Sequence, residues 1–152
     1  MNTLTNLPKK HLYYILISCS IIIVATSMET LMTVKDIDLF NQWLENHKAA
    51  EGAEISVDEA FNVFISVNLI YFLFKLVIPI SISLHSYFAY IKLKINGLFV
   101  FIWTVLVLGS MAYTLFEWSI NSIFYYINLT GYFILVVTLL SLINVIDKSK
   151  TS

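Results

Sequence analysis

The sequence predicts an all-α integral membrane protein: a four-helix bundle with a short amphipathic extracellular helix between its first and second spans. Three observations predict this fold. Of the 152 residues, 59% are hydrophobic and only 12% are charged, and the mean hydropathy is +0.81. Largely uncharged stretches of about 18 or more residues recur, long enough to cross a hydrocarbon layer of about 30 Å. Lysines and acids fall in separate segments. A soluble domain of this length could not bury so much apolar surface.

The predicted spans follow the apolar stretches in order along the chain. The first is expected at about residues 12–34, the second at 57–91, the third at 98–115 and the fourth at 121–145. The second stretch exceeds the thickness of a bilayer, so its helix must tilt, kink or project outward. Pro79 is expected to supply a kink, because proline removes a backbone donor and crowds the preceding turn. No repeat or linker interrupts the pattern, so all 152 residues form one domain.

Between the first two spans, residues 36–51 predict a short amphipathic helix. Apolar residues recur there at helical spacing, and acids occupy the other face. Ser56, with Glu59 three positions later, is a capping box that opens the second span. If a partner protein docks on the outer surface, the expected contact residues are those of this helix: Phe40, Trp43, Leu44 and Glu45.

Lysine placement predicts the orientation in the membrane. Six lysines border the spans on one side: Lys9, Lys10, Lys92, Lys94, Lys148 and Lys150. The segment 35–59 carries seven acids and two lysines. By the positive-inside rule, both termini are cytoplasmic and the acidic loop is outside. Abundant Ile, Lys and Asn with no Arg is typical of an A/T-rich bacterial genome, so the expected location is a bacterial plasma membrane.

The first span has an alternative interpretation. Lys9 and Lys10, an apolar run and the small residues at 25–27 resemble a secretory signal with its cleavage site. An uncleaved first helix is favoured, because the polar residues of this span would have no role in a discarded peptide.

Lys75 lies near the middle of the second span, among apolar neighbours. An ammonium in that position needs an anionic partner, a water-filled cavity or a functional role. At about 100° per residue, Asn68, Tyr71, Lys75 and Pro79 share one face of the helix. This face is expected to turn into the bundle or toward water.

Depth in the membrane selects the partners of Lys75. The distance along the helix axis from the cytoplasmic end of the span is about 22–25 Å for Lys75, about 25 Å for Glu29 and about 28 Å for Glu117. One or both glutamates are therefore predicted to pair with Lys75. Asn128 and Tyr132 share a face of the fourth span at the same level. Together these residues predict a polar chamber that opens outward.

The chamber has two interpretations. Buried polar contacts can hold helices together in a fixed register. Alternatively, ionisable groups in a membrane mark a binding or conduction site, and two acids facing one base leave a carboxylate for a cation, a proton or a basic residue of a partner. His85 is either a proton relay toward Lys75 or, as favoured here, a packing hydrogen bond near the inner interface.

The sequence contains no catalytic signature. The three histidines are scattered, the four glycines are isolated, and the single cysteine, Cys19, cannot form an intramolecular disulfide. We therefore expect no enzyme, no cofactor, no metal site and no nucleic-acid partner.

Two functions remain. In the favoured one, the chain is a small non-enzymatic accessory, regulatory or immunity-type membrane protein that binds another membrane protein, or itself as a homo-oligomer. In the alternative, it is an oligomeric channel or transporter for ions, protons or small solutes that uses the chamber around Lys75. In both, membrane lipid surrounds the bundle.

Overall fold

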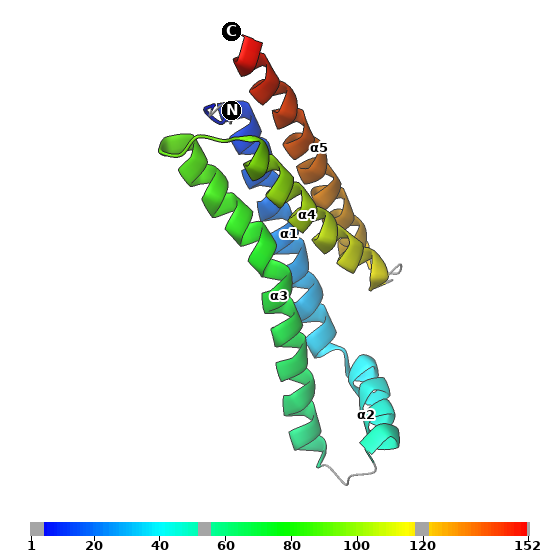
Figure 1. Ribbon diagram of the computed structural model, residues 1–152. Coiled ribbons are helices and arrows are strands. Elements are labelled where there is room, and N and C mark those ends of the chain that lie inside the picture. Colours follow the sequence, from blue (N-terminus) through cyan, green and yellow to red (C-terminus); the bar gives the residue numbers. More distant parts are fainter. Residues whose placement is uncertain (1–4, 52–55, 118–121, 152) are drawn as a thin grey trace.

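The computed structural model describes residues 5–51, 56–117 and 122–151. Within these ranges the fold is all-helical, as predicted, and Figure 1 shows how the helices are arranged. Four of the helices are long and apolar enough to cross a membrane. The predicted helices match the observed ones to within a few residues at most ends. The helices in chain order are α1 (Lys9–Lys35), α2 (Ile37–Glu51), α3 (Val57–Ile91), α4 (Gly97–Phe116) and α5 (Ile123–Thr151).

The core of the bundle lies between α1 and α5. Helix α1 packs extensively on both α3 and α5, and α5 packs on α4. Ile15 and Ile22 of α1 and Leu135 and Leu139 of α5 are fully buried in this core. In contrast, α3 and α4 pack on each other only sparsely. The space between α3 and α4 is therefore the loosest part of the bundle.

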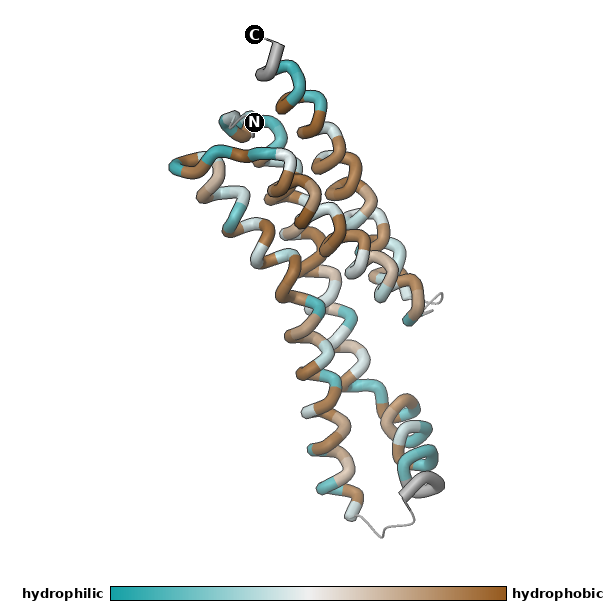
Figure 2. Tube along the Cα trace, viewed as in Figure 1, coloured by the Kyte–Doolittle hydropathy of each residue, from teal (hydrophilic) through white to brown (hydrophobic). Residues whose placement is uncertain are grey.

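The outward faces of the four long helices carry large apolar side chains. Val24, Phe74, Phe101 and Phe133 are among those that stay exposed. Figure 2 shows that hydrophobic residues dominate these four helices, whereas hydrophilic ones are more frequent in α2. Such an extensive exposed apolar surface is typical of a membrane protein, because lipid rather than water solvates it.

Polar side chains cap three of the helices. The carboxylate of Asp36 accepts hydrogen bonds at 3.0 Å from the backbone N–H groups of Asp38 and Leu39 at the start of α2. The Ser56 hydroxyl accepts from the backbone N–H of Glu59, as the predicted capping box requires. The amide oxygen of Asn96 caps α4 in the same way. These caps satisfy backbone donors that have no partner inside the helix.

The segment before α1 is joined to the turn before α4. Thr5 and Ile95 exchange two backbone hydrogen bonds, of 3.0 Å and 2.8 Å, and form an isolated antiparallel bridge. Ile95 is fully buried there. Both termini lie at this end of the molecule, and α2 lies at the opposite end (Figure 1).

Helix α2 folds back onto the N-terminal half of α3. Phe40 is buried against Ala60 and Phe64 of α3, and Trp43 and Leu44 pack beside it. The rings of Phe40 and Phe64 meet edge to face, with centroids 5.6 Å apart. We expected Phe40, Trp43 and Leu44 to be contact residues for a partner. In the structure Phe40 is buried inside the hairpin formed by α2 and α3, and Trp43 and Leu44 are partly buried beside it, so part of this apolar surface is covered within the chain itself. Glu45 remains exposed.

Pro79 lies inside α3, and the helix continues without a break from Val57 to Ile91. Figure 1 shows that α3 changes direction along its length. The predicted inward face of this helix is partly correct: Pro79 is buried and Lys75 is partly buried, but Tyr71 is 53% exposed.

Candidate binding site around Lys75

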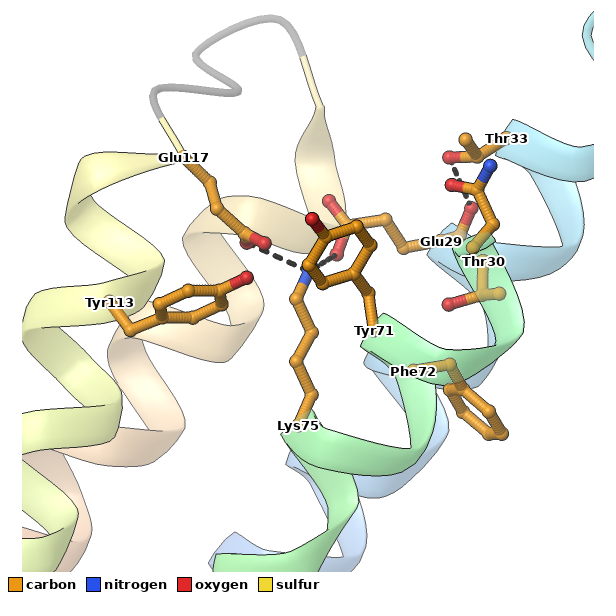
Figure 3. Close-up of a pocket in the computed structure, with 9 residues that line it drawn as sticks. Glu29, Thr30, Thr33, Tyr71, Phe72, Lys75, Tyr113 and Glu117 are labelled. Carbon is orange, nitrogen blue, oxygen red and sulfur yellow. Dashed lines mark hydrogen bonds and ion pairs between the residues drawn. The ribbon is translucent and has the colours of Figure 1, made fainter. Parts of the chain in front are cut away.

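Lys75 pairs with both predicted glutamates. Its Nζ atom lies 2.7 Å from Oε2 of Glu117 and 3.9 Å from Oε2 of Glu29 (Figure 3). The three side chains come from α3, from the end of α4 and from α1, and they are 19%, 27% and 18% exposed. The ion pairs therefore connect three helices at one level of the bundle. The prediction that one or both glutamates pair with Lys75 is confirmed.

Glu29 also accepts a hydrogen bond from a side chain near α5. The hydroxyl of Ser122, just before α5, donates a hydrogen bond of 3.3 Å to Oε1 of Glu29. The two oxygens of Glu29 therefore contact different helices, because Oε2 faces Lys75. The 3.9 Å separation makes Glu29 the weaker partner of the lysine. Charge-assisted contacts at this level thus involve all four long helices or their ends.

The three charged groups line a polar cavity of about 350 Å³. Thr30, Thr33 and Asn68 line it beside Glu29, and Tyr71 and Tyr113 line it beside Lys75. In Figure 3 the rings of Tyr71 and Tyr113 lie on either side of the lysine and direct their hydroxyls toward the charged groups. The lining residues described by the structure carry two carboxylates and one ammonium, so the formal charge of the cavity is −1.

Asn68 lines this cavity but does not contact a charged group through its amide nitrogen. Its Nδ2 atom donates to the backbone oxygen of Phe64 at 2.9 Å, within the same helix. Thr30, Thr33 and Ser122 were not predicted from the sequence. Thr33 follows Glu29 by four positions, so helical spacing could have indicated its presence near that carboxylate, whereas the position of Thr30 next to Glu29 in the sequence gave no such signal.

A second space lies next to the polar cavity, between α3 and α4. It measures about 650 Å³ and its walls are largely apolar, with Phe74 and Ile78 on α3 and Val105 and Leu106 on α4. The two spaces share three lining residues, Tyr71, Lys75 and Tyr113. We call the larger space the α3–α4 groove. Because α3 and α4 pack sparsely, this groove is open along the side of the bundle.

Two predicted members of the chamber do not line the polar cavity. Asn128 is buried between α5 and α1, where its Oδ1 atom accepts a hydrogen bond of 3.4 Å from the hydroxyl of Thr26. Tyr132 is also buried and lines the α3–α4 groove. Neither is among the described residues that line the polar cavity. Their helix face turns toward α1 and the groove rather than toward the carboxylates.

His85 does not face Lys75. Its Nδ1 atom accepts a hydrogen bond of 3.0 Å from the indole Nε1–H of Trp103 on α4, and its ring meets Phe99 edge to face. This is the packing hydrogen bond that the sequence favoured over a proton relay. Trp103 is buried, so the imidazole satisfies a donor that would otherwise lack a partner.

The arrangement offers charged groups for electrostatic binding. Within the described ranges, no group of three or more His, Cys, Asp or Glu side chains could hold a metal ion. No known family, curated protein or solved structure matches the chain. The function must therefore be argued from the geometry alone.

Proposed function

We propose that this protein is a non-enzymatic membrane protein of the plasma membrane that acts as an accessory, regulatory or immunity-type subunit by binding another membrane protein. In this proposal both termini are cytoplasmic, the α2–α3 hairpin is extracellular, and the membrane is bacterial. The lysines near the two termini and the acids of the hairpin support this orientation through the positive-inside rule.

The main support for the proposal is that the α2–α3 hairpin extends beyond the rest of the bundle (Figure 1). With 35 residues, α3 extends about 52 Å, whereas the 20 residues of α4 extend about 30 Å, roughly the hydrocarbon thickness. The outer part of α3 therefore has no neighbour on α4 or α5 and is accompanied by α2 (Figure 1). Such a projecting arm reaches a partner outside the lipid.

The hairpin is built as a firm, charged surface. The packing of Phe40 on Phe64 holds α2 against α3, while the acids Asp38, Glu45, Asp58 and Glu59 remain exposed. Leu39 and Phe61 add exposed apolar area, 42% and 39% exposed. A preorganised surface loses little conformational entropy on binding, and its negative charge favours a partner with basic residues.

Site-specific photocrosslinking in native membranes tests this function. A photoreactive amino acid at Leu39 or Phe61 is expected to give one adduct of discrete mass with another membrane protein. The matched control is Leu140 on α5, which is similarly exposed but lies on the bundle. Charge reversal by Glu45→Lys with Asp58→Lys should abolish the adduct, whereas Lys92→Glu at the opposite end should not.

Three outcomes would contradict the proposal. Equal adducts from position 140 would indicate collision rather than docking. An adduct of twice the mass of this chain would make a second copy the partner. No adduct from either hairpin position, in membranes where the protein is folded, would leave the hairpin without a docking role.

The polar cavity supports a second candidate, transport of an ion, a proton or a small solute. Its specific support is the meeting of Lys75, Glu29 and Glu117, three partly buried charged side chains that line one cavity. If transport is the function, Lys75→Met should abolish flux in proteoliposomes, and the hairpin charge reversal should leave it unchanged. Protein that inserts correctly and gives no flux of common ions, or unchanged flux in Lys75→Met, would count strongly against this candidate.

A further inference from the structure

The polar cavity and the α3–α4 groove are two parts of one continuous site. Tyr71, Lys75 and Tyr113 line both spaces. Figure 3 shows the Lys75 side chain rising from α3 with its ammonium among the carboxylates, so its alkyl stem borders the groove and its charged head faces the cavity. A ligand that fits both spaces needs a polar head attached to an apolar body.

The charge of the polar cavity favours a ligand with a cationic head group. The described side chains of the polar cavity have a formal charge of −1, because two carboxylates face one ammonium. A cation is therefore attracted more strongly than an anion of equal size. The rings of Tyr71 and Tyr113 flank the charged groups, and aromatic faces favour an ammonium over a neutral group. A phosphate-bearing lipid head would bring a further anion beside two carboxylates, which disfavours it.

The size and apolar walls of the α3–α4 groove favour a ligand with an apolar chain. The groove, at about 650 Å³, is within the range of roughly 300–1,000 Å³ that small-molecule sites occupy. Its polar surface is minor, and its walls come from α3 and α4, with Tyr132 of α5 beneath. A Cβ atom at Gly109, which lines the groove, would meet no atom within 4 Å among the described residues. The groove is therefore open at this glycine and can take one apolar chain.

We propose that this site binds a single-chain amphiphile with an ammonium head. The head lies in the polar cavity next to Glu29 and Glu117, and the chain extends along the groove between Phe74 and Leu106. The ligand enters from the membrane through the side of the bundle. This inference is independent of the docking proposed for the α2–α3 hairpin.

The test uses the full-length protein in nanodiscs of a zwitterionic lipid. The probe is a twelve-carbon primary amine with a photoreactive diazirine in its chain. We expect saturable labelling of the α3 and α4 residues that line the groove, displaced by unlabelled dodecylamine. The matched probes are the alcohol and the carboxylate of the same length, which should label the groove at least about tenfold less strongly. The alcohol has no charge to pair with the glutamates, and the carboxylate is repelled by them.

Three variants test the charged groups of the polar cavity, and a fourth serves as a control. Glu117→Gln and Glu29→Gln should each weaken amine binding, whereas Glu45→Gln on the hairpin should not. Lys75→Met should strengthen amine binding, because it removes the competing ammonium and keeps an unbranched side chain of nearly the same length. A loss of folding cannot produce that gain.

Filling the groove gives a test that leaves all charges in place. Gly109→Leu should abolish labelling. Gly97→Leu is its control, because Gly97 has the same open surroundings but lies at the start of α4, outside the groove. Equal labelling by the amine and the alcohol would overturn the proposal, since the groove would then hold only lipid chains. Unchanged amine binding in Gly109→Leu would also overturn it.

Discussion

Ile22 of α1 lies so close to Gly131 of α5 that a Cβ atom at position 131 would fall 2.6 Å from Cγ1 of the isoleucine. Ile22 is fully buried. In a membrane, where lipid chains are as apolar as the helices, close packing at small residues is a main source of helix association. This contact therefore determines how closely the two central helices approach each other.

Gly131→Ala should destabilise the bundle by about 1–3 kcal/mol, because the added methyl group overpacks a filled contact. Thermal unfolding in mild detergent measures the loss. Gly109→Ala is the matched control and should be neutral or slightly stabilising, since its surroundings are open. If the contact is correct, Ile22→Ala combined with Gly131→Ala should cost less than the sum of the single changes.

The hydrogen bond from Thr26 to Asn128 should couple α1 and α5 weakly but measurably. In a double-mutant cycle with Thr26→Val and Asn128→Leu, the expected coupling energy is about 0.6 kcal/mol, the average for such bonds in membranes. Both side chains are buried, at 2% and 3% exposure. The cycle is read by unfolding in detergent. A coupling energy indistinguishable from zero would show that the two side chains pack without bonding.

The two glutamates should contribute unequally to stability. Glu117→Gln is expected to lower the free energy of unfolding by about 1–2 kcal/mol, less than the roughly 3–5 kcal/mol of a fully buried pair, because the cavity admits solvent. Glu29→Gln should cost less, since its carboxylate lies 3.9 Å rather than 2.7 Å from Nζ of Lys75. Thermal melts of the two variants in one detergent provide the comparison. The reverse order would contradict the geometry.

Phe40→Ala should release α2 from α3 without unfolding the bundle. Removing a buried phenylalanine costs about 3–5 kcal/mol. Among the described residues, the Phe40 ring packs within the hairpin, against Ala60, Phe64 and their neighbours. Hydrogen exchange should accelerate in α2 and remain slow in α1 and α5. Leu39→Ala, at an exposed position, is the control and should leave exchange in α2 unchanged. Faster exchange throughout α5 would show that the hairpin and the bundle unfold together.

The helices and the central ion pair could be predicted from local chemistry. Long uncharged stretches determine the helices, because backbone groups in lipid must bond within their own segment. The partners of Lys75 followed from the cost of an isolated ammonium in an apolar helix and from a count of residues along each span.

Tertiary packing decides the features that could not be predicted from the sequence. The α3–α4 groove exists because α3 packs far more extensively on α1 than on α4, and no single helix encodes that preference. Phe40 and Trp43 are apolar on an amphipathic helix, which predicts burial but does not identify whether α3, lipid or a partner covers them. The sequence predicted that Asn128 lies on a polar face of its helix, but not that this face turns toward Thr26 of α1. The rotation of a helix about its own axis depends on all its contacts.

The bridge between Thr5 and Ile95 has a mechanical consequence. It fastens the start of α1 to the start of α4 at the end that carries both termini. If α3 and α4 move apart, they should therefore stay together at this end and separate most at the opposite end of α4, near Glu117. An extension added at the N-terminus that disturbs Thr5 would loosen that pivot, although it lies at the far end of the bundle from the ion pair.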